Sequence, residues 1–342
     1  MTGHRAWHRL LAPLAPLYRG AVRARLSAYD RGWLHSSKLP VPVISVGNLT
    51  FGGTGKTPTV IALVRDLVRR GRHPAVLTRG YGRAGREPVV LVGPEPKAPV
   101  EAAGDEPLEL ARRLPGVPVV VNPDRVEGGI EARTRGADVV VLDDGFQHLK
   151  LRRDLDLVLL DAGDPWGGGR MAPGGRLREP ASGLARADAV LVTKLPTVAE
   201  PVLAEIRRTV DALAPEMPVL AARLEPAAVR RNGEPCGVDI LRSARVLAAA
   251  GLGRPEGFVQ LLREAGAQVV GTAFRDDHHP WTPDEVQAVV DRAAGLDAVA
   301  VTTAKDAVKM PAALPLWVVE VEMTPLAGSW DDLWRICPQA AS

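Results

Sequence analysis

The chain has 342 residues, of which 46% are hydrophobic and 24% are charged, so it has the material for a globular core, and its length favours two domains over one. A net charge of +3 argues against a surface that coats nucleic acid, and no apolar stretch approaches the roughly 18 residues that a membrane-spanning helix needs. The two cysteines, Cys236 and Cys337, lack metal-ligand spacing, and a reducing cytoplasmic compartment fits best.

The first 36 residues predict a basic amphipathic segment. Residues 1–29 contain five arginines and no acidic residue, and apolar side chains recur at steps of three and four. Pro13 and Pro16 divide the segment, so the helix is expected to begin near Pro16. Such a helix either lies in an anionic membrane interface or packs on the neighbouring domain, and the pattern leaves both open. A cleaved signal peptide is disfavoured because Arg19 interrupts the short apolar run.

A glycine-rich turn follows the first strongly apolar run. Residues 41–46 predict a strand and residues 59–70 a helix, and "GNLTFGGTGKTP" lies between them. Strand, glycine loop and helix are the context of a phosphate-binding loop, in which backbone N–H groups, a lysine and a Ser/Thr hydroxyl hold phosphates and Mg²⁺. One position departs from G-x-x-x-x-G-K-[ST], because Thr50 stands where the first glycine belongs. The residues predicted to hold the nucleotide are Thr50, Phe51, Gly52, Gly53, Thr54, Gly55, Lys56 and Thr57.

Further apolar runs alternate with helical patterns. Strands are expected at 75–78, 117–121, 137–143, 155–162 and 187–194, with a helix over 103–114. This alternation predicts a P-loop NTPase-type α/β fold, with a mainly parallel sheet and helices on both faces. The loops carrying Lys56, Arg79, Asp143 and Lys194 should then share the carboxyl edge of the sheet, where ligands bind. Residues 163–180 are rich in glycine and predict a functional loop.

A second, smaller α/β domain is expected after residue 218. The segment 218–235 predicts a strand pair with an Asn232-Gly233 turn, and the rest alternates strands with helices, one of them capped by Thr282 or Asp284. The predicted organisation is therefore an N-terminal segment at 1–36, a P-loop domain at 37–217, a β linker at 218–235 and a C-terminal domain at 236–342.

Three acidic clusters are candidates for chemistry. Asp143 and Asp144 end an apolar strand, as a carboxylate that orders Mg²⁺ does in P-loop enzymes. Asp105 and Glu106 open a helix and alone would complement its dipole. The loop 276–279, "DDHH", contains four titratable residues, which is more than a surface turn needs. It favours a carboxylate–histidine pair that tunes proton transfer across a domain cleft.

Together these motifs resemble one enzyme family. The segments "GNLTFGGTGKTP", "RGYGR", "GDEP", "DDGFQH", "PGGRLREP", "VTK", "AGLGRPEGF", "DDHHPWT" and "TTAKDAVK" occur in the order found in tetraacyldisaccharide 4'-kinases, the lipid A 4'-kinases of Gram-negative bacteria. The resemblance covers about residues 41–310. That family tolerates a non-glycine residue at the position of Thr50.

The resemblance implies ATP-dependent phosphorylation of the 4'-hydroxyl of a tetraacylated glucosamine disaccharide 1-phosphate. It implies that Asp105 is the catalytic base, assisted by His278, and that Lys56 stabilises phosphate. Thr57, Asp143 and Asp144 would serve Mg²⁺ and the active-site hydrogen bonds, with the division between the aspartates left open. Further matches to family positions are Arg79, Tyr81, Glu106, Gln147, His148, Glu179 and Asp277.

One local departure from the family lies in the loop 276–279. Asp276 stands where the family commonly has proline before its Asp-His pair. Asp277 and His278 are aligned to that pair, which leaves His279 as the weaker candidate. A base and a histidine on different domains would imply closure over ATP.

The expected partners follow from a lipid acceptor. They are the acylated disaccharide and an anionic membrane surface, without nucleic acid, for a monomer bound peripherally at the cytoplasmic face of the inner membrane. The alternative from another class is a membrane-associated P-loop ATPase or GTPase switch. It shares the phosphate loop, the strand-end aspartates and the basic helix, but it leaves the loop 276–279 and the segment 163–180 without a role.

Overall fold

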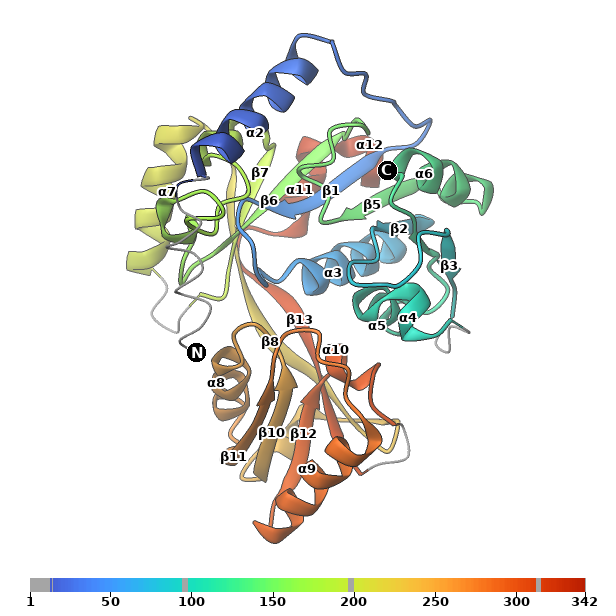
Figure 1. Cartoon of the computed structure of the whole chain (residues 1–342), viewed down its shortest axis with the longest axis vertical. Helices are drawn as coiled ribbons and strands as arrows, with labels where there is room; N and C mark the ends of the chain where they lie inside the picture. The colour runs from blue at the N-terminus through green and yellow to red at the C-terminus, as the bar shows by residue number, and fades with distance from the viewer. Residues whose placement is uncertain (1–12, 14, 94–97, 196–199, 312–314, 342) are drawn as a thin grey trace. The chain divides into compact units, whose positions relative to one another are not determined.

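The structure is a computed structural model that describes residues 13, 15–93, 98–195, 200–311 and 315–341 (Figure 1). Arg5, Arg9 and the rest of residues 1–12 of the predicted N-terminal segment lie outside the described residues. None of the helices among the described residues combines the length and the apolar character needed to cross a bilayer.

The chain divides into two compact units that interleave along the sequence. Unit 1 comprises Met1–Arg79, Val117–Arg223 and Thr324–Ser342, and unit 2 comprises Gly80–Gly116 and Leu224–Met323. These units differ from the contiguous domains expected from sequence, because residues 80–116 make their contacts with the later segment and residues 324–342 make theirs with the earlier one.

The sheet of unit 1 is parallel, as predicted. Its strand order is β8-β7-β6-β1-β5-β2-β4. The bounds are β1 (Val43–Asn48), β2 (Pro74–Thr78), β4 (Val119–Val121), β5 (Val139–Asp143), β6 (Leu155–Asp161), β7 (Ala189–Thr193) and β8 (Val219–Arg231), of which β8 continues into unit 2. Nearly every strand residue between β1 and β7 is buried, which explains the continuous apolar runs in the sequence.

Helices cover this sheet. The helices of unit 1 are α2 (Ala15–Asp30), α3 (Lys56–Arg69), α6 (Arg125–Thr134), α7 (Glu200–Leu213), α11 (Trp330–Ile336) and α12 (Pro338–Ala341). α3 contacts β1, β2 and β5, and α6 contacts β2 and β4. α7 packs Leu203, Ile206 and Val210 on apolar side chains of β6 and β7. Short 3₁₀ turns lie at Gly167–Gly169 and Ala181–Arg186, so the segment 163–180 is largely loop, as expected.

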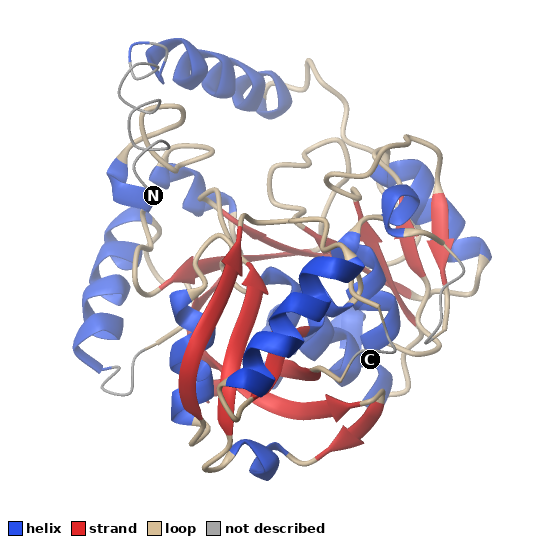
Figure 2. Cartoon of the chain, turned by 60° about the horizontal axis from the view of Figure 1, so that its bottom comes forward, coloured by secondary structure: helices blue, strands red, loops and turns tan. Residues whose placement is uncertain are grey.

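Unit 2 contains a smaller parallel sheet with the order β11-β10-β12-β13 (Figure 1). Figure 2 distinguishes the strands and helices of the chain by colour. Its strands are β10 (Arg245–Gly251), β11 (Gln268–Arg275), β12 (Val299–Thr303) and β13 (Trp317–Ala327), of which β13 ends in unit 1. Alternate residues of β10 face opposite sides, so α8 (Glu256–Glu264) packs on Val246, Ala248 and Ala250 while α9 (Pro283–Gly295) packs on Leu247 and Ala249.

The remaining elements of unit 2 lie around this sheet. β8 and β9 (Glu234–Cys236) form the predicted antiparallel hairpin. Thr282 caps α9 in a capping box with Glu285, which decides between the two cap candidates. The other elements are β3 (Val89–Leu91), α4 (Val100–Ala103), α5 (Asp105–Arg113), the 3₁₀ turn η4 (Val238–Leu241) and α10 (Ala304–Ala307).

Candidate functional site

The glycine-rich loop connects β1 to α3 in unit 1. Gly55 has φ 88° and directly precedes the first turn of α3, a conformation that favours glycine. Thr50 does not adopt positive φ; it is buried and bridges Leu177, while the N–H of Phe51 donates to the carbonyl of Arg176 at 2.7 Å. A first glycine is therefore not required for the turn out of β1, which accounts for the substitution.

Lys56 and the strand-end aspartates lie together beside this loop. Asp143, the last residue of β5, pairs with Val46 of the neighbouring β1. Lys56 Nζ lies 3.5 Å from Asp144 Oδ1 and 3.4 Å from Asn48 Oδ1. Arg178 Nη1 donates to both oxygens of Asp144 at 2.8 Å. Burial alone would raise the pKa of Asp144, but the charges of Lys56 and Arg178 hold it below its ordinary value, so the carboxylate is ionised.

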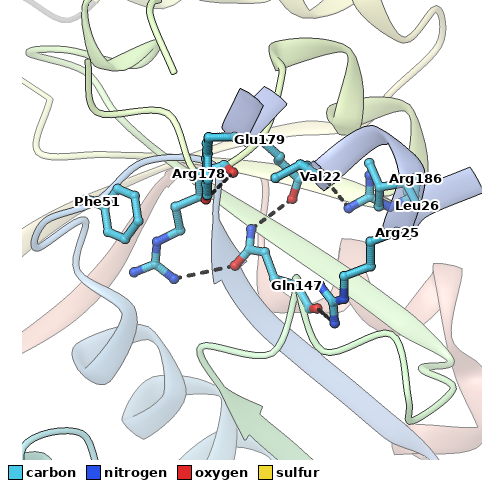
Figure 3. A pocket seen from close by; sticks show the side chains of 9 residues that line it. Val22, Arg25, Leu26, Phe51, Gln147, Arg178, Glu179 and Arg186 are labelled. Carbon is cyan, nitrogen blue, oxygen red and sulfur yellow. Dashed lines mark hydrogen bonds and ion pairs between the residues drawn. The ribbon is translucent and has the colours of Figure 1, made fainter. Parts of the chain in front are cut away.

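A pocket lies between α2 and this cluster (Figure 3). Its volume is about 190 Å³, and it is lined by Tyr18, Val22, Arg25, Leu26, Phe51, Gln147, Arg178, Glu179 and Arg186. Gln147 Nε2 donates to Glu179 Oε1 at 2.9 Å and to the carbonyl of Asn48 at 2.9 Å. The Arg178 guanidinium also lies over the Phe51 ring, 5.0 Å from its centroid.

Specific contacts hold helix α2 against the rest of unit 1. The Tyr18 hydroxyl donates to the carbonyl of Arg178 at 2.9 Å, and Arg25 Nη2 donates to the carbonyl of Gln147 at 3.1 Å. Val22 packs against the apolar cluster under α7, while Leu17 on another face is 72% exposed. One face of the basic helix therefore packs on the unit, and another stays in solvent.

Three other candidate residues of unit 1, Arg79, His148 and Lys194, are not part of the pocket lining. Arg79 is exposed at the end of β2. His148 is partly buried, and burial, together with the charge of Arg125, lowers its pKa to about 4, so it is neutral. Lys194 pairs with Asp161 at 3.0 Å and donates to the carbonyl of Gly53 in the phosphate loop. It therefore supports the loop from the end of β7.

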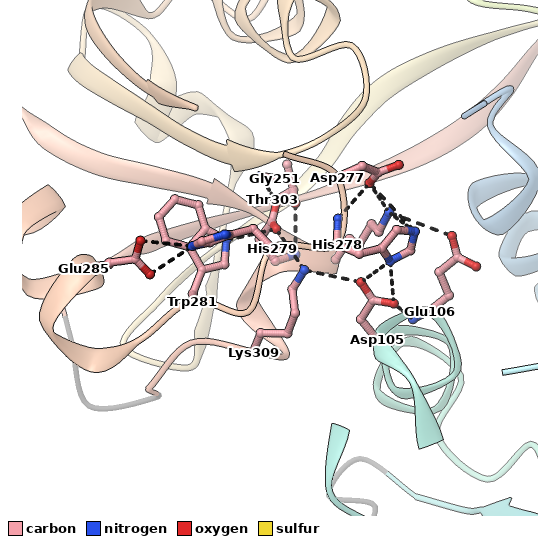
Figure 4. Close-up of polar contacts among 12 residues, drawn as sticks. Asp105, Glu106, Gly251, Asp277, His278, His279, Trp281, Glu285, Thr303 and Lys309 are labelled. Atoms are coloured by element: carbon pink, nitrogen blue, oxygen red, sulfur yellow. Dashed lines mark hydrogen bonds and ion pairs between the residues drawn. The ribbon is translucent and has the colours of Figure 1, made fainter. Parts of the chain in front are cut away.

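Asp105 and His278 are in direct contact within unit 2 (Figure 4). His278 Nδ1 lies 2.9 Å from Asp105 Oδ2 and 3.1 Å from Oδ1. From sequence the pair was expected to span two domains, but both residues belong to the same compact unit. The reason is that α5 contacts α10. These two helices are far apart in the sequence, and no local pattern indicates that they meet.

The backbone around the pair is specialised. Gly104 directly precedes α5 with φ 92° and ψ 158°, a region open essentially to glycine, and this turn places Asp105 at the helix start. His278 adopts φ 62°, which is uncommon for a residue with a side chain. Asp144 and Lys194 of unit 1 also adopt positive φ.

The charges around Asp105 keep it ionised. Burial alone would raise the pKa of this 5% exposed carboxyl, but the hydrogen bond from His278 and the charges of Lys305, His278 and Lys309 lower it well below its ordinary range. The same hydrogen bond raises the pKa of His278. Because a carboxylate accepts and an ammonium donates, the neutral imidazole carries its proton on Nδ1 and presents Nε2 to Lys305 Nζ at 3.5 Å.

The other candidates of unit 2 surround this pair. Asp277 accepts from Lys305 Nζ at 2.8 Å, and Glu106 lies 3.9 Å from the same ammonium. The Tyr81 ring, 71% exposed, lies 5.8 Å from that of His278. His279 instead contacts Glu285, with its Nε2 2.9 Å from Glu285 Oε2.

Sequence reasoning missed several participants. Arg178 and Asn48 were not singled out, nor were Lys305 and Lys309. Each lies inside a quoted motif: "GNLT", "PGGRLREP" and "TTAKDAVK". Membership of a motif was therefore the sequence signal that could have indicated these residues. Nothing in the local sequence, however, shows that Arg178 matters as much as Glu179, or which lysine of a motif is buried.

Comparisons with known proteins agree over nearly the whole chain. The sequence model of the family described as Tetraacyldisaccharide-1-P 4'-kinase (LpxK) matches residues 7–336. A tetraacyldisaccharide 4'-kinase of Anaeromyxobacter sp. (strain Fw109-5) is 44% identical over 318 residues, which cover 90% of this chain and 85% of that protein. The Geobacter sulfurreducens protein of the same name is 41% identical over 324 residues, 93% of this chain and 89% of its own.

A solved structure supports the fold as well. The crystal structure of LpxK from Aquifex aeolicus in complex with ATP is 30% identical and superposes with a TM-score of 0.77, covering 98% of this chain and 100% of that one. The P-loop α/β fold predicted from sequence is thereby confirmed. The chain belongs to the tetraacyldisaccharide 4'-kinase family, a family of lipid kinases.

Proposed function

We propose that this chain transfers the γ-phosphoryl group of ATP to the 4'-hydroxyl of a tetraacylated glucosamine disaccharide 1-phosphate, with Asp105 accepting the hydroxyl proton. The observation that carries the proposal is the Asp105–His278 pair: a buried carboxylate, held ionised and oriented by a histidine. A phosphate-binding loop alone is equally consistent with hydrolysis. The oriented carboxylate supports transfer to an acceptor alcohol.

The phosphate loop of unit 1 supplies the groups that phosphoryl transfer needs. Lys56 brings a positive charge to the terminal phosphates, and the backbone N–H groups from Gly52 to Thr57 cradle their oxygens. The Thr57 hydroxyl and the carboxylates of Asp143 and Asp144 are the hard oxygen donors that Mg²⁺ prefers, so this set fits the ion. Mg²⁺ bound there would neutralise charge that develops on the phosphates.

Arg178 offers a further positive charge next to the loop. Its guanidinium bridges Asp144 and lies within 3.4 Å of Gln147 Oε1, so its orientation is fixed by two partners. A preorganised cation stabilises the transferring phosphoryl group without rearrangement at the moment of reaction. We assign Arg178 this electrostatic role, and Gln147 the role of holding it.

Asp105 suits a loose phosphoryl-transfer transition state. In such a state the nucleophile loses its proton late, so the base mainly orients the hydroxyl and accepts the proton once the bond to phosphorus forms. An ionised carboxylate with a low pKa can do this, and His278 stabilises its charge through Nδ1–H. The phosphate loop belongs to unit 1 and the Asp105–His278 pair to unit 2.

The base assignment is tested with Asp105→Asn in the full chain. The variant should bind ATP like the wild type and lose about 10²- to 10⁴-fold in kcat for the lipid acceptor, the usual contribution of general base catalysis. Equilibrium binding of a fluorescent ATP analogue and initial rates at saturating Mg²⁺ and ATP measure the two effects. Wild-type turnover in this variant would refute the assignment.

We also propose that α2 attaches the protein peripherally to an anionic membrane surface, at the cytoplasmic face of the inner membrane. Leu17, Arg19 and Arg23 are exposed on the helix, and Trp33 beyond its end is 72% exposed. A basic surface with apolar residues binds anionic lipid, and each cation near the surface contributes about 1 kcal/mol. The packing of Tyr18 and Val22 on unit 1 leaves this face available.

Charge reversal tests this attachment. Arg19→Glu with Arg23→Glu should weaken binding to phosphatidylglycerol vesicles at least about 30-fold, which corresponds to a loss of about 2 kcal/mol. Arg133→Glu with Arg208→Glu, two exposed arginines elsewhere on unit 1, is the matched control for net charge. Equal loss of vesicle binding in both double variants would show that only net charge matters, and no loss in the first would refute a role of α2.

The alternative, a P-loop ATPase or GTPase switch, predicts hydrolysis without an acceptor. It gives no role to the Asp105–His278 pair. Release of free phosphate at the same rate with and without the lipid acceptor would favour it over the kinase.

A further inference from the structure

A buried lysine joins Asp105 to a second carboxylate of unit 2. The Lys309 side chain is only 6% exposed, and its Nζ lies 3.3 Å from Asp105 Oδ2 and 3.4 Å from Asp306 Oδ1 (Figure 4). Lysine is almost never buried unless it is paired, because desolvating an ammonium is costly. The burial of Lys309 therefore depends on these two carboxylates.

Asp306 is itself held rigidly. It is fully buried, and its Oδ2 accepts from the N–H of Gly251 at 3.0 Å and from Thr303 Oγ1 at 2.8 Å. Its Oδ1 accepts from Trp281 Nε1 at 3.2 Å and faces Lys309. These partners come from the end of β10, the loop before α9 and the end of β12. The carboxylate is thus fixed from three directions.

This network accounts for motif residues that the proposed chemistry leaves without a role. Gly251 begins the "GLGRP" turn, Trp281 belongs to "DDHHPWT", and Thr303, Asp306 and Lys309 belong to "TTAKDAVK". The three segments converge on Asp306, and Lys309 extends from there to Asp105.

We propose that Lys309, anchored by Asp306, is a positioning residue that fixes the carboxylate of Asp105 for the reaction. The proposal rests on the role assigned to Asp105 above. Lys309 holds Oδ2 from one side while His278 contacts both oxygens from another, so rotation of the carboxylate would break contacts with both partners. A displacement of about 1 Å in a reacting group can cost about 100-fold in rate, which is why such an anchor matters.

Lys305 serves a different part of the cluster. Its Nζ lies 2.8 Å from Asp277 Oδ1 and 3.5 Å from His278 Nε2, so its direct partners are the histidine and its neighbours. Lys309 is the lysine in direct contact with the carboxylate of Asp105. The titratable groups that face Asp105 and His278 are Tyr81, Glu106 and Glu109 from the segment before α5 and from α5 itself, Asp277 from the loop before α9, and Lys305, Asp306 and Lys309 from α10 and the residues after it.

The test compares Lys309→Met with Lys309→Arg in the full chain. Lys309→Met should lower kcat by about 100-fold with little change in the KM for ATP. Loss of a positive charge next to the carboxylate favours its protonated form, so the acid limb of the kcat profile should move to higher pH by about one to three units. Lys309→Arg keeps the charge and should hold the acid limb near its wild-type position.

Two controls make the result interpretable. Lys150→Met removes an exposed lysine paired with Asp124 in unit 1 and should leave both kcat and the acid limb unchanged. Asp105→Asn separates the two proposals: if it turns over like the wild type, the base assignment fails whatever Lys309 does. If Asp105→Asn loses activity as predicted while Lys309→Met shows a wild-type kcat and acid limb, the inference alone fails.

Folding and purely structural effects are decided separately. A fall in kcat with an unmoved acid limb in Lys309→Met would show a structural role and overturn the inference. Should Lys309→Met fail to fold, judged by circular dichroism, Lys309→Met with Asp306→Asn removes both buried charges together, which is tolerated better. The acid limb of the kcat profile of this double variant should still move to higher pH than in the wild type, although by less than in Lys309→Met alone. An acid limb at the wild-type pH would overturn the inference.

Discussion

The Asp105–His278 contact predicts that the two side chains act as a unit. His278→Gln keeps a polar side chain but removes the imidazole that lies 2.9 Å from Asp105 Oδ2. A hydrogen bond to a charged partner contributes about 1.5 to 3 kcal/mol, so if this bond is used in the transition state, kcat should fall about 10- to 150-fold. Asp105→Asn should cost more, about 10²- to 10⁴-fold, because the proton acceptor itself is lost.

A double-mutant cycle measures the coupling. If His278 acts only through Asp105, the double variant should be no slower than Asp105→Asn, because the histidine has nothing left to orient. Rates are measured as phosphorylation of the lipid acceptor at saturating ATP and Mg²⁺, with thermal unfolding of each variant as the control for folding. A double variant whose loss equals the product of the two single losses would refute the coupled pair.

Two further predictions concern helix α5. Glu109 is buried, and burial raises the pKa of its carboxyl from 4.5 to about 7. Between pH 4.5 and pH 7 the native protein therefore retains a proton that the unfolded chain has lost, and the stability of the fold falls as the pH rises through this range. Glu109→Gln should remove this loss, so the free energy of unfolding of the variant, relative to that of the wild type, should be up to about 3 kcal/mol higher at pH 8 than at pH 4.5. Urea unfolding of both proteins at both pH values measures this difference, and an equal pH dependence in the two proteins would contradict the prediction. Gly104→Ala forces a side chain into φ 92° and within 3.3 Å of the Tyr81 carbonyl, so it should destabilise the fold by about 1 to 3 kcal/mol and lower kcat through Asp105, and wild-type values of both would show that this turn is not strained.

Local patterns were sufficient for the strands β1, β2 and β4 to β7 and for the phosphate loop. The apolar runs at β1, β5, β6 and β7 are buried on both faces, so their sequence alone indicated a parallel sheet. The order of the strands places the loops after β1, β2, β5 and β7 at one edge, as expected for residues such as Lys56 and Asp143.

Contacts between distant segments could not be predicted. The assignment of residues 80–116 to unit 2 depends on α5 meeting α10, almost 200 positions later, and neither helix carries a local sign of this. Lys309 and Arg178 were overlooked for the same reason, because their importance comes from burial and from partners such as Asp105 and Asp144. β13, α11 and α12 were not predicted from the sequence, because they follow the last recognised motif, "TTAKDAVK".

The central claim is tested most directly by following the label of γ-³²P-ATP. Purified full-length protein is incubated with Mg²⁺ and the tetraacylated disaccharide 1-phosphate, and the products are separated into glycolipid and free phosphate. The account predicts label on the 4'-position of the glycolipid, with its appearance slowed about 10²- to 10⁴-fold by Asp105→Asn. Label that accumulates only as free phosphate, at a rate independent of the acceptor, would contradict it.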